Sequence, residues 1–331
     1  MKTPTNLIPL ILLFLLILLP SVASEYLLHI FILVLLWAYL ATSWNILGGY
    51  AGQHSLGHGV FLGIGAYTST LLFIRLGISP WLGMWIGGAL SALAAWFIGY
   101  LCFRYGLKGP YFALVTIALA EAFVFLSSNI VSVGGARGLE VTWIGNNPLM
   151  MQFDGKLGYY YIILIILVFG ILITQWLHKR RPGYQWVAVR ENEDAAEALG
   201  VDTLRTKIEA TVLSAFMTAI GGTFYAQYFT YIGPRTVFGE VVSVQILIFA
   251  IIGGLGTVWG PAVGALLLVP VAELARANLS GSVGGAHLVL YGMVMVLVML
   301  FVPKGIVGLA KDVLSKLNRR YAKKNIYKEA L

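Results

Sequence analysis

Residues 26–47 read YLLHIFILVLLWAYLATSWNIL, and this run of 22 residues contains no Asp, Glu, Lys or Arg. A helix needs about 20 mostly apolar residues to cross the hydrocarbon core of a bilayer. The run therefore predicts a membrane-spanning helix. Similar runs recur along almost the whole sequence, so the predicted fold class is an all-α polytopic membrane protein.

The composition agrees with this prediction. Of the 331 residues, 59% are hydrophobic and only 11% are Asp, Glu, Lys or Arg, whereas a soluble domain carries about 25% charged residues. So few charges cannot cover a globular surface, which excludes a soluble enzyme, a nucleic-acid-binding domain and a disordered protein. The single cysteine, Cys102, excludes a disulfide framework and thiolate metal sites.

The apolar runs predict about ten spans, with eight as the alternative. The region 241–276 is long and interrupted by glycines, and it is interpreted either as two short crossings or as a re-entrant hairpin. The first run, 7–22, is expected to be a retained helix, although Ser21-Val22-Ala23 resembles the cleavage site of a signal peptide. The other runs are 60–76, 81–103, 111–129, 158–177, 208–232 and 287–302.

Basic residues are concentrated in two segments that flank apolar runs. The segment 178–207 holds six and the part of the chain after Val302 holds eight, so the two contain 14 of the 22 Lys and Arg residues. The positive-inside rule places such segments in the cytoplasm. Either ten or eight spans bring both segments to that side and make both termini cytoplasmic. Nucleic-acid binding would need these residues on a water-soluble face, so no nucleic-acid partner is expected.

We predict one transmembrane domain over 1–309, with the cytoplasmic loop 178–207 inside it and a basic cytoplasmic tail over 310–331. The longest polar segments have about 30 residues each, which is too few for an independent hydrophobic core. The lipid bilayer is therefore the main environment of the chain.

The stretch 190–200 reads RENEDAAEALG and predicts a short helix. Asn192 suits the amino-terminal cap, and Gly200 suits the left-handed position after the last turn. Ala195, Ala196 and Leu199 are predicted to share one shallow apolar face. Anionic headgroups would repel the carboxylates around this helix, so docking into a groove of a partner protein is favoured over lying on the membrane surface. These carboxylates are Glu191, Glu193, Asp194, Glu197 and Asp202.

Several motifs of catalysis are absent from the sequence. It contains no G-x-x-x-x-G-K-[ST] loop to cradle phosphates, so any ATP hydrolysis must come from another chain. It contains neither H-E-x-x-H nor G-x-S-x-G, and no paired nucleophile and base emerge. We therefore predict no catalytic residues, metal or cofactor, and a membrane enzyme is the weakest interpretation.

The stretch 48–65 is dense in glycine and carries His54, Ser55 and His58. One interpretation is a broken helix whose backbone lines a translocation path. The other is close helix packing through small residues, which the G-x-x-x-G pattern at 59–63 fits. The two histidines would share one face of a helix, but a metal pair lacks a third ligand nearby. We expect one or both of them instead to hydrogen-bond backbone groups freed by the break.

Glu121 lies near the middle of the run 111–129. A charged residue at the bilayer centre costs about 2.5–3.5 kcal/mol on insertion scales and rarely faces lipid. We expect Glu121 to face a water-filled path or to pair with another helix. The residues predicted for a translocation path are thus His54, Ser55, His58 and Glu121.

The loop sequence resembles a known motif. Asp194-Ala195-Ala196, followed by three residues and Gly200, is similar to the E-A-A-x-x-x-G loop of ABC importer permeases, with Asp in place of the usual Glu. Five further stretches, which lie between Ser43 and Leu309, resemble signatures of the branched-chain amino acid permease family (LivM type) and occur in the family's order. They are AGQHSLGHGVFLGIGAY at 51–67, GPYFALVT at 109–116, GGARGL at 134–139, GGLGTVWGP at 253–261 and PKGIVGL at 303–309.

The resemblance implies a permease subunit of an ABC importer in a bacterial inner membrane. ATPase subunits of that family dock on the loop and drive alternating access, which here implicates Glu191, Asp194, Ala195, Ala196, Leu199 and Gly200. The resemblance also implies a second permease subunit, expected to form a hetero-dimeric pair. An extracytoplasmic solute-binding protein would hold most of the affinity for the cargo, which is expected to be branched-chain or related amino acids.

Two alternatives stay open. The urea and short-chain amide branch of the same family shares these motifs. An ion- or proton-coupled secondary transporter would use Glu121 and the histidines as its coupling groups.

Overall fold

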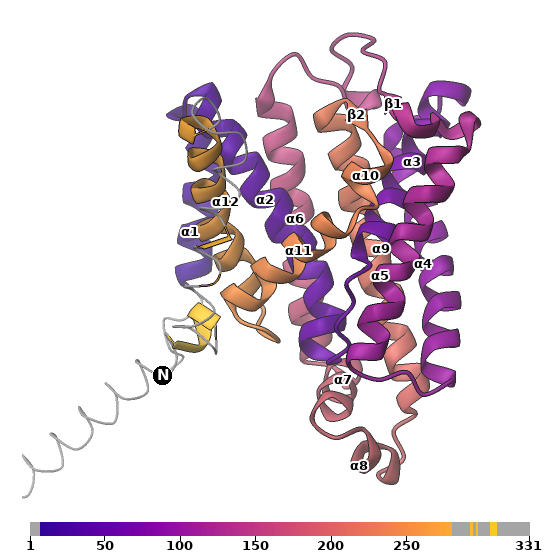
Figure 1. Ribbon diagram of the computed structural model, residues 1–331. Coiled ribbons are helices and arrows are strands. Elements are labelled where there is room, and N and C mark those ends of the chain that lie inside the picture. The colour runs from indigo at the N-terminus through magenta and orange to yellow at the C-terminus, as the bar shows by residue number, and fades with distance from the viewer. Residues whose placement is uncertain (1–6, 280–291, 294–295, 297–304, 310–331) are drawn as a thin grey trace, which may run out of the picture.

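The computed structural model describes residues 7–279, 292, 293, 296 and 305–309. Within these residues the chain is mostly helical (Figure 1), and seven helices are long and apolar enough to cross a membrane. The predicted all-α polytopic class is therefore confirmed. The count of ten stays a prediction, because the run 287–302 lies almost entirely outside the described residues, as does the tail 310–331.

The α-helices in chain order are α1 (Leu7–Leu18), α2 (Glu25–Asn45), α3 (His58–Leu76), α4 (Pro80–Arg104), α5 (Pro110–Asn129), α6 (Lys156–His178), α7 (Arg181–Glu191), α8 (Glu193–Ala198), α9 (Thr203–Phe229), α10 (Pro234–Val237), α11 (Glu240–Gly253) and α12 (Gly260–Leu279). A π-helical turn, η3 (Ile46–Tyr50), continues α2, and short 3-10 turns are η2 (Leu19–Ser21), η4 (Val131–Val133), η5 (Gly135–Arg137) and η6 (Pro148–Met150). The strands are β1 (Leu139–Glu140) and β2 (Tyr231–Ile232).

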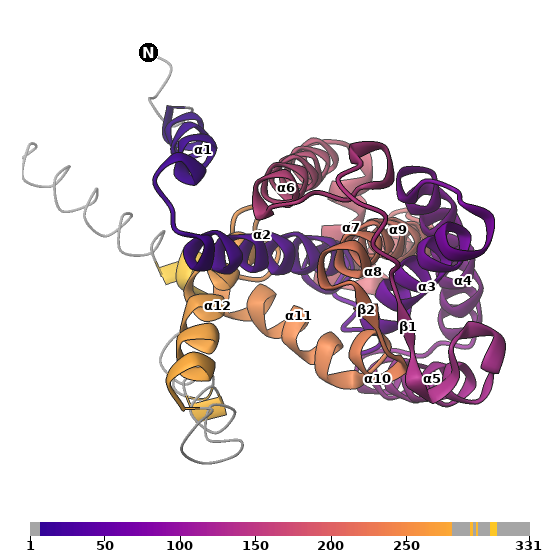
Figure 2. The ribbon, with the colours of Figure 1, turned by 90° about the horizontal axis from the view of Figure 1, so that it is seen from above.

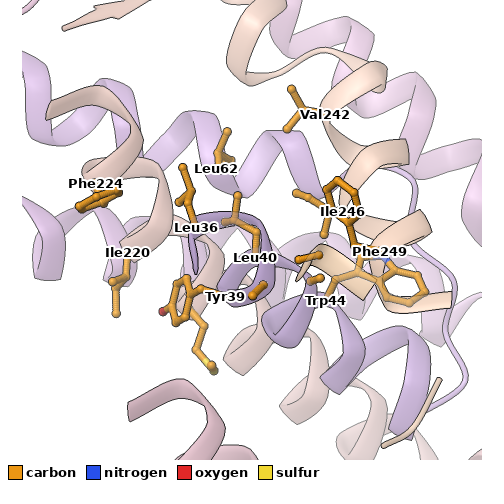
Figure 3. Packing of buried hydrophobic residues seen from close by; sticks show 14 of the residues in the cluster. Leu36, Tyr39, Leu40, Trp44, Leu62, Ile220, Phe224, Val242, Ile246 and Phe249 are labelled. Atoms are coloured by element: carbon orange, nitrogen blue, oxygen red, sulfur yellow. The ribbon is translucent and has the colours of Figure 1, made fainter. Parts of the chain in front are cut away.

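The helix α2 is the centre of the fold. A helix that is apolar on all sides needs other elements around it, and 89% of the most apolar stretch within Glu25–Tyr50 is buried. Helices α6, α9, α11 and α12 pack around it. Figure 3 shows Leu36, Tyr39 and Leu40 of α2 among side chains of α9 and α11. The run that predicts the fold is thus the most enclosed of the seven apolar helices.

Helix α9 is less apolar than its neighbours, yet it lies inside the bundle against α3 and α4. Glycines let the backbones approach closely. A Cβ on Gly222 of α9 would lie 2.1 Å from the carbonyl oxygen of Leu62, and a Cβ on Gly65 of α3 would lie 2.1 Å from that of Ala219. The close-packing interpretation is therefore confirmed for glycines of this interface.

The predicted interruption of the region 241–276 is confirmed. Helix α11 ends at Gly253 and α12 begins at Gly260. A Cβ on Gly253 would lie 1.7 Å from the carbonyl oxygen of Gly260, so the two helix ends meet with their backbones in contact. The intervening loop, residues 254–259, is the second break in the membrane helices; the first is the segment 46–57 between α2 and α3.

A small departure from the all-α prediction lies outside the helices. Strands β1 and β2 pair antiparallel, with Leu139 opposite Ile232 and Glu140 opposite Tyr231. The approach depends on Gly138, whose φ is +76° and whose Cβ would lie 2.3 Å from the carbonyl oxygen of Ile232. Two residues per strand give too weak a pattern for sequence-based prediction. The pairing ties the loop 130–155 to the end of α9.

The bundle has two distinct ends (Figure 1). Helices α7 and α8 form one, here called the α8 end, and strands β1 and β2 mark the other, here called the β end. Helix α2 joins them: Glu25 pairs with Lys156 at its start, and Tyr50 lies against His178 beyond its end. Viewed from above (Figure 2), α5 lies at the edge of the bundle, and only 28% of its apolar stretch is buried.

Candidate functional site

The stretch 190–200 folds into parts of two helices rather than one. Arg190 and Glu191 end α7, a helix that the sequence analysis did not predict, and α8 contains only Glu193–Ala198. The predicted cap is confirmed, because the Asn192 side chain accepts a hydrogen bond from the Ala195 backbone N–H at 3.0 Å. The helix axis therefore turns at Asn192, which joins α8 directly to α7.

The carboxyl end of α8 is closed as predicted. Gly200 has φ +84°, and its N–H donates to the carbonyl oxygen of Glu197 at 2.9 Å. The N–H of Val201 donates to that of Ala196 at 3.0 Å. This pair of bonds is the Schellman arrangement, in which a left-handed glycine satisfies the last carbonyl groups of a helix. A six-residue helix thus has defined ends without help from other subunits.

The predicted apolar face of α8 is wrong in one respect. Ala196 is buried against the rest of the chain, whereas Ala195 and Leu199 are exposed, with Leu199 87% exposed. Because Ala196 packs against the bundle, Ala195 and Leu199 lie on the side of this short helix that faces away from it. The surface left for a partner is therefore Leu199 with Ala195, bordered by the exposed Asp194.

Glu193 fixes α8 to the membrane bundle, a role that the sequence analysis did not assign to it. Its Oε1 accepts a hydrogen bond from Lys207 Nζ of α9 at 2.6 Å, and its Oε2 lies 3.3 Å from Lys108 Nζ in the α4–α5 loop. The Lys207 side chain is only 3% exposed and also lies over the Phe103 ring at 5.0 Å. Lys108 lies 3.6 Å from Asp194 as well. The sequence held one signal for this pairing. Lys207 lies near the start of a helix that is buried in the bundle, and a buried ammonium group needs a carboxylate partner.

The protonation of Glu193 follows from this setting. Burial alone would raise its pKa, but the hydrogen bonds and charges of Lys207 and Lys108 outweigh burial and lower the pKa below its ordinary value of 4.5. In return, the hydrogen bond to Glu193 raises the pKa of Lys108. Glu193 and Lys108 are therefore both charged at neutral pH.

The first break, segment 46–57, and the start of α3 are held by polar side chains from three helices. Trp44 Nε1 donates to the Ser55 carbonyl oxygen at 2.8 Å. Thr116 Oγ1 of α5 accepts from the Leu56 N–H at 3.0 Å, and Ser243 Oγ of α11 accepts from the Gly59 N–H at 2.8 Å. Backbone groups that a helix would have paired internally are thus satisfied by side chains.

His54 and His58 do not share a helix face, because α3 begins only at His58. His58 is fully buried, and its Nε2 lies 2.8 Å from Ser214 Oγ of α9. Ser214 donates its single hydroxyl hydrogen to the Ser43 carbonyl oxygen at 2.6 Å. His58 Nε2 is therefore the donor in the bond to Ser214. For His58 the expected bond to the backbone is therefore replaced by a bond to a serine. His54 is exposed, with its ring 6.1 Å from that of Trp44.

The residues predicted for a path are brought together only in part. Ser55 and the two histidines lie around Trp44, whereas Glu121 is half-buried on the outer helix α5. Within the described part of the chain, Glu121 makes no hydrogen bond or ion pair, and no group of three His, Cys, Asp or Glu side chains could hold a metal ion. The position of α5 at the edge of the bundle was not predictable from the place of Glu121 within its apolar run.

Comparisons with known proteins agree with one another. Residues 26–302 match the family described as "Branched-chain amino acid transport system / permease component". The chain is 27% identical over 322 residues to the high-affinity branched-chain amino acid transport system permease protein LivM of Escherichia coli (strain K12), covering 90% of this chain and 74% of that protein.

Two further relatives are similar along most of their length. The high-affinity branched-chain amino acid transport system permease protein LivH of Salmonella typhimurium (strain LT2) is 24% identical over 286 residues, which cover 82% of this chain and 91% of that protein. The L-arabinose transport system permease protein AraH of Escherichia coli (strain K12) is 26% identical over 240 residues, 71% of this chain and 70% of that protein. No solved structure matches the chain.

Proposed function

Because the chain belongs to the family of permease components of branched-chain amino acid transport systems, we propose that it forms part of the membrane path of an ATP-driven importer of branched-chain or related amino acids. The amino-acid cargo is supported by the names of the LivM and LivH relatives, which describe branched-chain amino acid transport. The same names favour amino acids over urea and short-chain amides.

The observation that carries the proposal is α8. It is a short helix with both ends capped, it presents the exposed Leu199, and it is fixed to α9 by the ion pair of Glu193 with the buried Lys207. A firmly held helix with an uncovered leucine is suited to dock in a groove of another protein. We propose that this docking partner is an ATPase subunit. When the ATPase subunits close on nucleotide, they move α8 and, through α8, the membrane-spanning helices.

The proposed orientation puts the α8 end in the cytoplasm, in an inner membrane. The segment 178–207, with its six basic residues, lies at this end, as does Lys108. Such a concentration of Lys and Arg beside spans is typical of cytoplasmic loops. Both termini are proposed to be cytoplasmic as well.

The proposed partners follow from the relatives. Proteins named LivM and LivH are both permease components, and this chain is similar to each. We propose a second permease subunit of the same family, separate ATPase subunits and an extracytoplasmic solute-binding protein. To test the assignment, the complex is purified through a tag on this chain, and its soluble binding protein is titrated with leucine, valine, urea and acetamide. Saturable binding of leucine or valine is expected, and binding of urea or acetamide alone would overturn the cargo.

Glu121 remains a proposed path residue. Its half-buried position on α5 would otherwise present a carboxylate to lipid, which is costly, so we propose that it faces the second permease or the path between the two. Glu121→Gln keeps the shape and is expected to lower uptake several-fold with the amount of assembled complex unchanged. Wild-type uptake by this variant would show that no charge is required there, and would also weigh against an ion-coupled transporter.

A further inference from the structure

The side chain of Arg190 reaches from the cytoplasmic loop into the first break of the membrane helices. Its Nη1 donates to the carbonyl oxygen of Gly49 at 2.8 Å. Its stem lies against Gly52, where a Cβ would come within 2.6 Å of Arg190 Cγ. Gly52 has φ +70°, which suits glycine, so the chain there both turns and leaves room for the arginine.

The same side chain touches the second break. A Cβ on Gly256 would lie 2.5 Å from Arg190 Nη1 and 3.0 Å from the Gly49 carbonyl oxygen. Gly256 also has a positive φ, +65°. Glycines from two separate breaks and one arginine from the loop therefore meet at a single point.

Asn45 joins the two breaks to each other. Its Oδ1 accepts a hydrogen bond from the Gly256 N–H at 2.9 Å, and its Nδ2 donates to the Thr257 carbonyl oxygen at 2.9 Å. The last residue of α2 is thus bonded to the loop between α11 and α12. Because of these bonds, the two breaks form one connected unit with Arg190 at its cytoplasmic edge.

An arginine is chemically suited to this position. The guanidinium has five N–H donors in a fixed plane. Nε and Nη2 donate to Glu191 Oε1 at 3.1 and 2.6 Å, which leaves Nη1 directed at Gly49. The carbonyl end of a helix carries partial negative charge, so a cation there is favourable. A lysine ammonium has no such fork and cannot hold Glu191 and Gly49 in the same geometry.

We propose that Arg190 is the positioning residue through which displacement of α7 and α8 reaches both breaks in the membrane helices. Only Glu191 and Asn192 separate it from the first residue of α8, so a movement of α8 carries the last turn of α7 with it. The inference rests on the proposed function, since α8 is displaced only if an ATPase subunit docks on it.

The first test measures coupling. The complete complex, with its ATPase subunits, second permease and binding protein, is reconstituted in vesicles, and leucine uptake and ATP hydrolysis are measured on the same preparation. Arg190→Ala is expected to hydrolyse ATP at close to the unsubstituted rate, and to transport at least about tenfold less leucine per ATP. Arg190→Lys is expected to recover part of this ratio. Arg205→Ala is the control, because Arg205 is an exposed arginine of the same basic segment, 178–207, and its guanidinium pairs with Glu209 alone among the described residues.

The second test measures movement. Spin labels are placed at Ala198→Cys on α8 and Leu255→Cys on the second break, in a chain whose buried Cys102 is replaced by alanine. With Arg190 present, the separation of the labels is expected to stay narrow and unchanged when ATP binds. With Arg190→Ala it is expected to broaden or shift with ATP. Identical separations in the two proteins would overturn the inference.

The outcomes of these tests distinguish a failure of the proposed role of Arg190 from a failure of the proposed function. ATP-dependent uptake by the unsubstituted complex, together with a normal ratio of leucine to ATP in Arg190→Ala, would overturn the role of Arg190 alone. If Arg190 had only a structural role, Arg190→Ala would lower the amount or melting temperature of the complex and leave the ratio of leucine to ATP unchanged. That result would also overturn the positioning role of Arg190. Absence of ATP-dependent uptake in the unsubstituted complex would overturn the proposed function and this inference together.

Discussion

Glu193→Ala is expected to destabilise the chain by about 3–5 kcal/mol, because it leaves an ammonium group buried without its carboxylate. The Lys207 side chain is 3% exposed and is bonded to Glu193 at 2.6 Å. The Phe103 ring at 5.0 Å is too weak a partner to replace a carboxylate. The measurement is the melting temperature of the purified chain in detergent. Transport by the complex is expected to fall with it, since α8 loses its attachment to α9.

Two further variants make this prediction specific. Glu209→Ala removes the exposed Arg205–Glu209 pair and is expected to cost no more than about 1 kcal/mol. Combining Glu193→Ala with Lys207→Met removes both charges of the pair, including the buried ammonium group, and is expected to restore most of the lost stability, as exchange of buried ion pairs for apolar residues often does. A melting temperature for Glu193→Ala equal to that of Glu209→Ala would contradict the account.

The same pair predicts a dependence on pH. The pKa of Glu193 is lowered by its lysine partners, so its contribution to stability is fully present above the ordinary value of 4.5 and is lost as pH falls through the lowered pKa. The melting temperature of the natural chain is therefore expected to fall more steeply below pH 4.5 than that of the Glu193→Ala, Lys207→Met double variant. Parallel curves for the two proteins would show that Glu193 is not the titrating group.

Leu199→Asp is expected to abolish most of the association with ATPase subunits without changing the stability of the chain. Leu199 is 87% exposed, so the fold loses almost no packing when it is replaced. Full burial of a leucine in a partner groove contributes about 1.5–3 kcal/mol, which corresponds to about tenfold or more in affinity. The measurement is the amount of ATPase subunit that co-purifies with the tagged chain.

The control for this prediction is Val131→Asp. Val131 is 88% exposed and lies at the β end, opposite α8, so its replacement is expected to leave co-purification unchanged. Leu199 is a better probe than Ala196, because Ala196 is buried and its replacement by a bulky residue would disturb the fold as well. Equal amounts of ATPase subunit with Leu199→Asp and Val131→Asp would mean that α8 is not the docking surface.

Features that depend on a few neighbouring residues were predictable from the sequence. The Asn192 cap and the Gly200 end of α8 are local motifs, and the structure confirms both. The run 26–47 and the glycine interruption after α11 were recognisable for the same reason, since length and glycine content are properties of one segment.

Features that depend on contacts between distant segments were not predictable. Glu193 and Lys207 are 14 residues apart, and Arg190 and Gly49 are 141 apart, so neither pairing leaves a pattern in one stretch of sequence. The inward turn of Ala196 is of the same kind, because the packing of α8 against the bundle decides it. His58 likewise forms its hydrogen bond with Ser214, which lies 156 residues away in the sequence.

The central claim is that this chain forms the path of an importer powered by ATP. The most direct measurement is uptake of radioactive leucine by vesicles that contain the complete complex and its binding protein, with ATP supplied on the side of α8. The account predicts uptake that requires ATP and persists when proton and sodium gradients are collapsed. Uptake that follows an imposed ion gradient without ATP would contradict it.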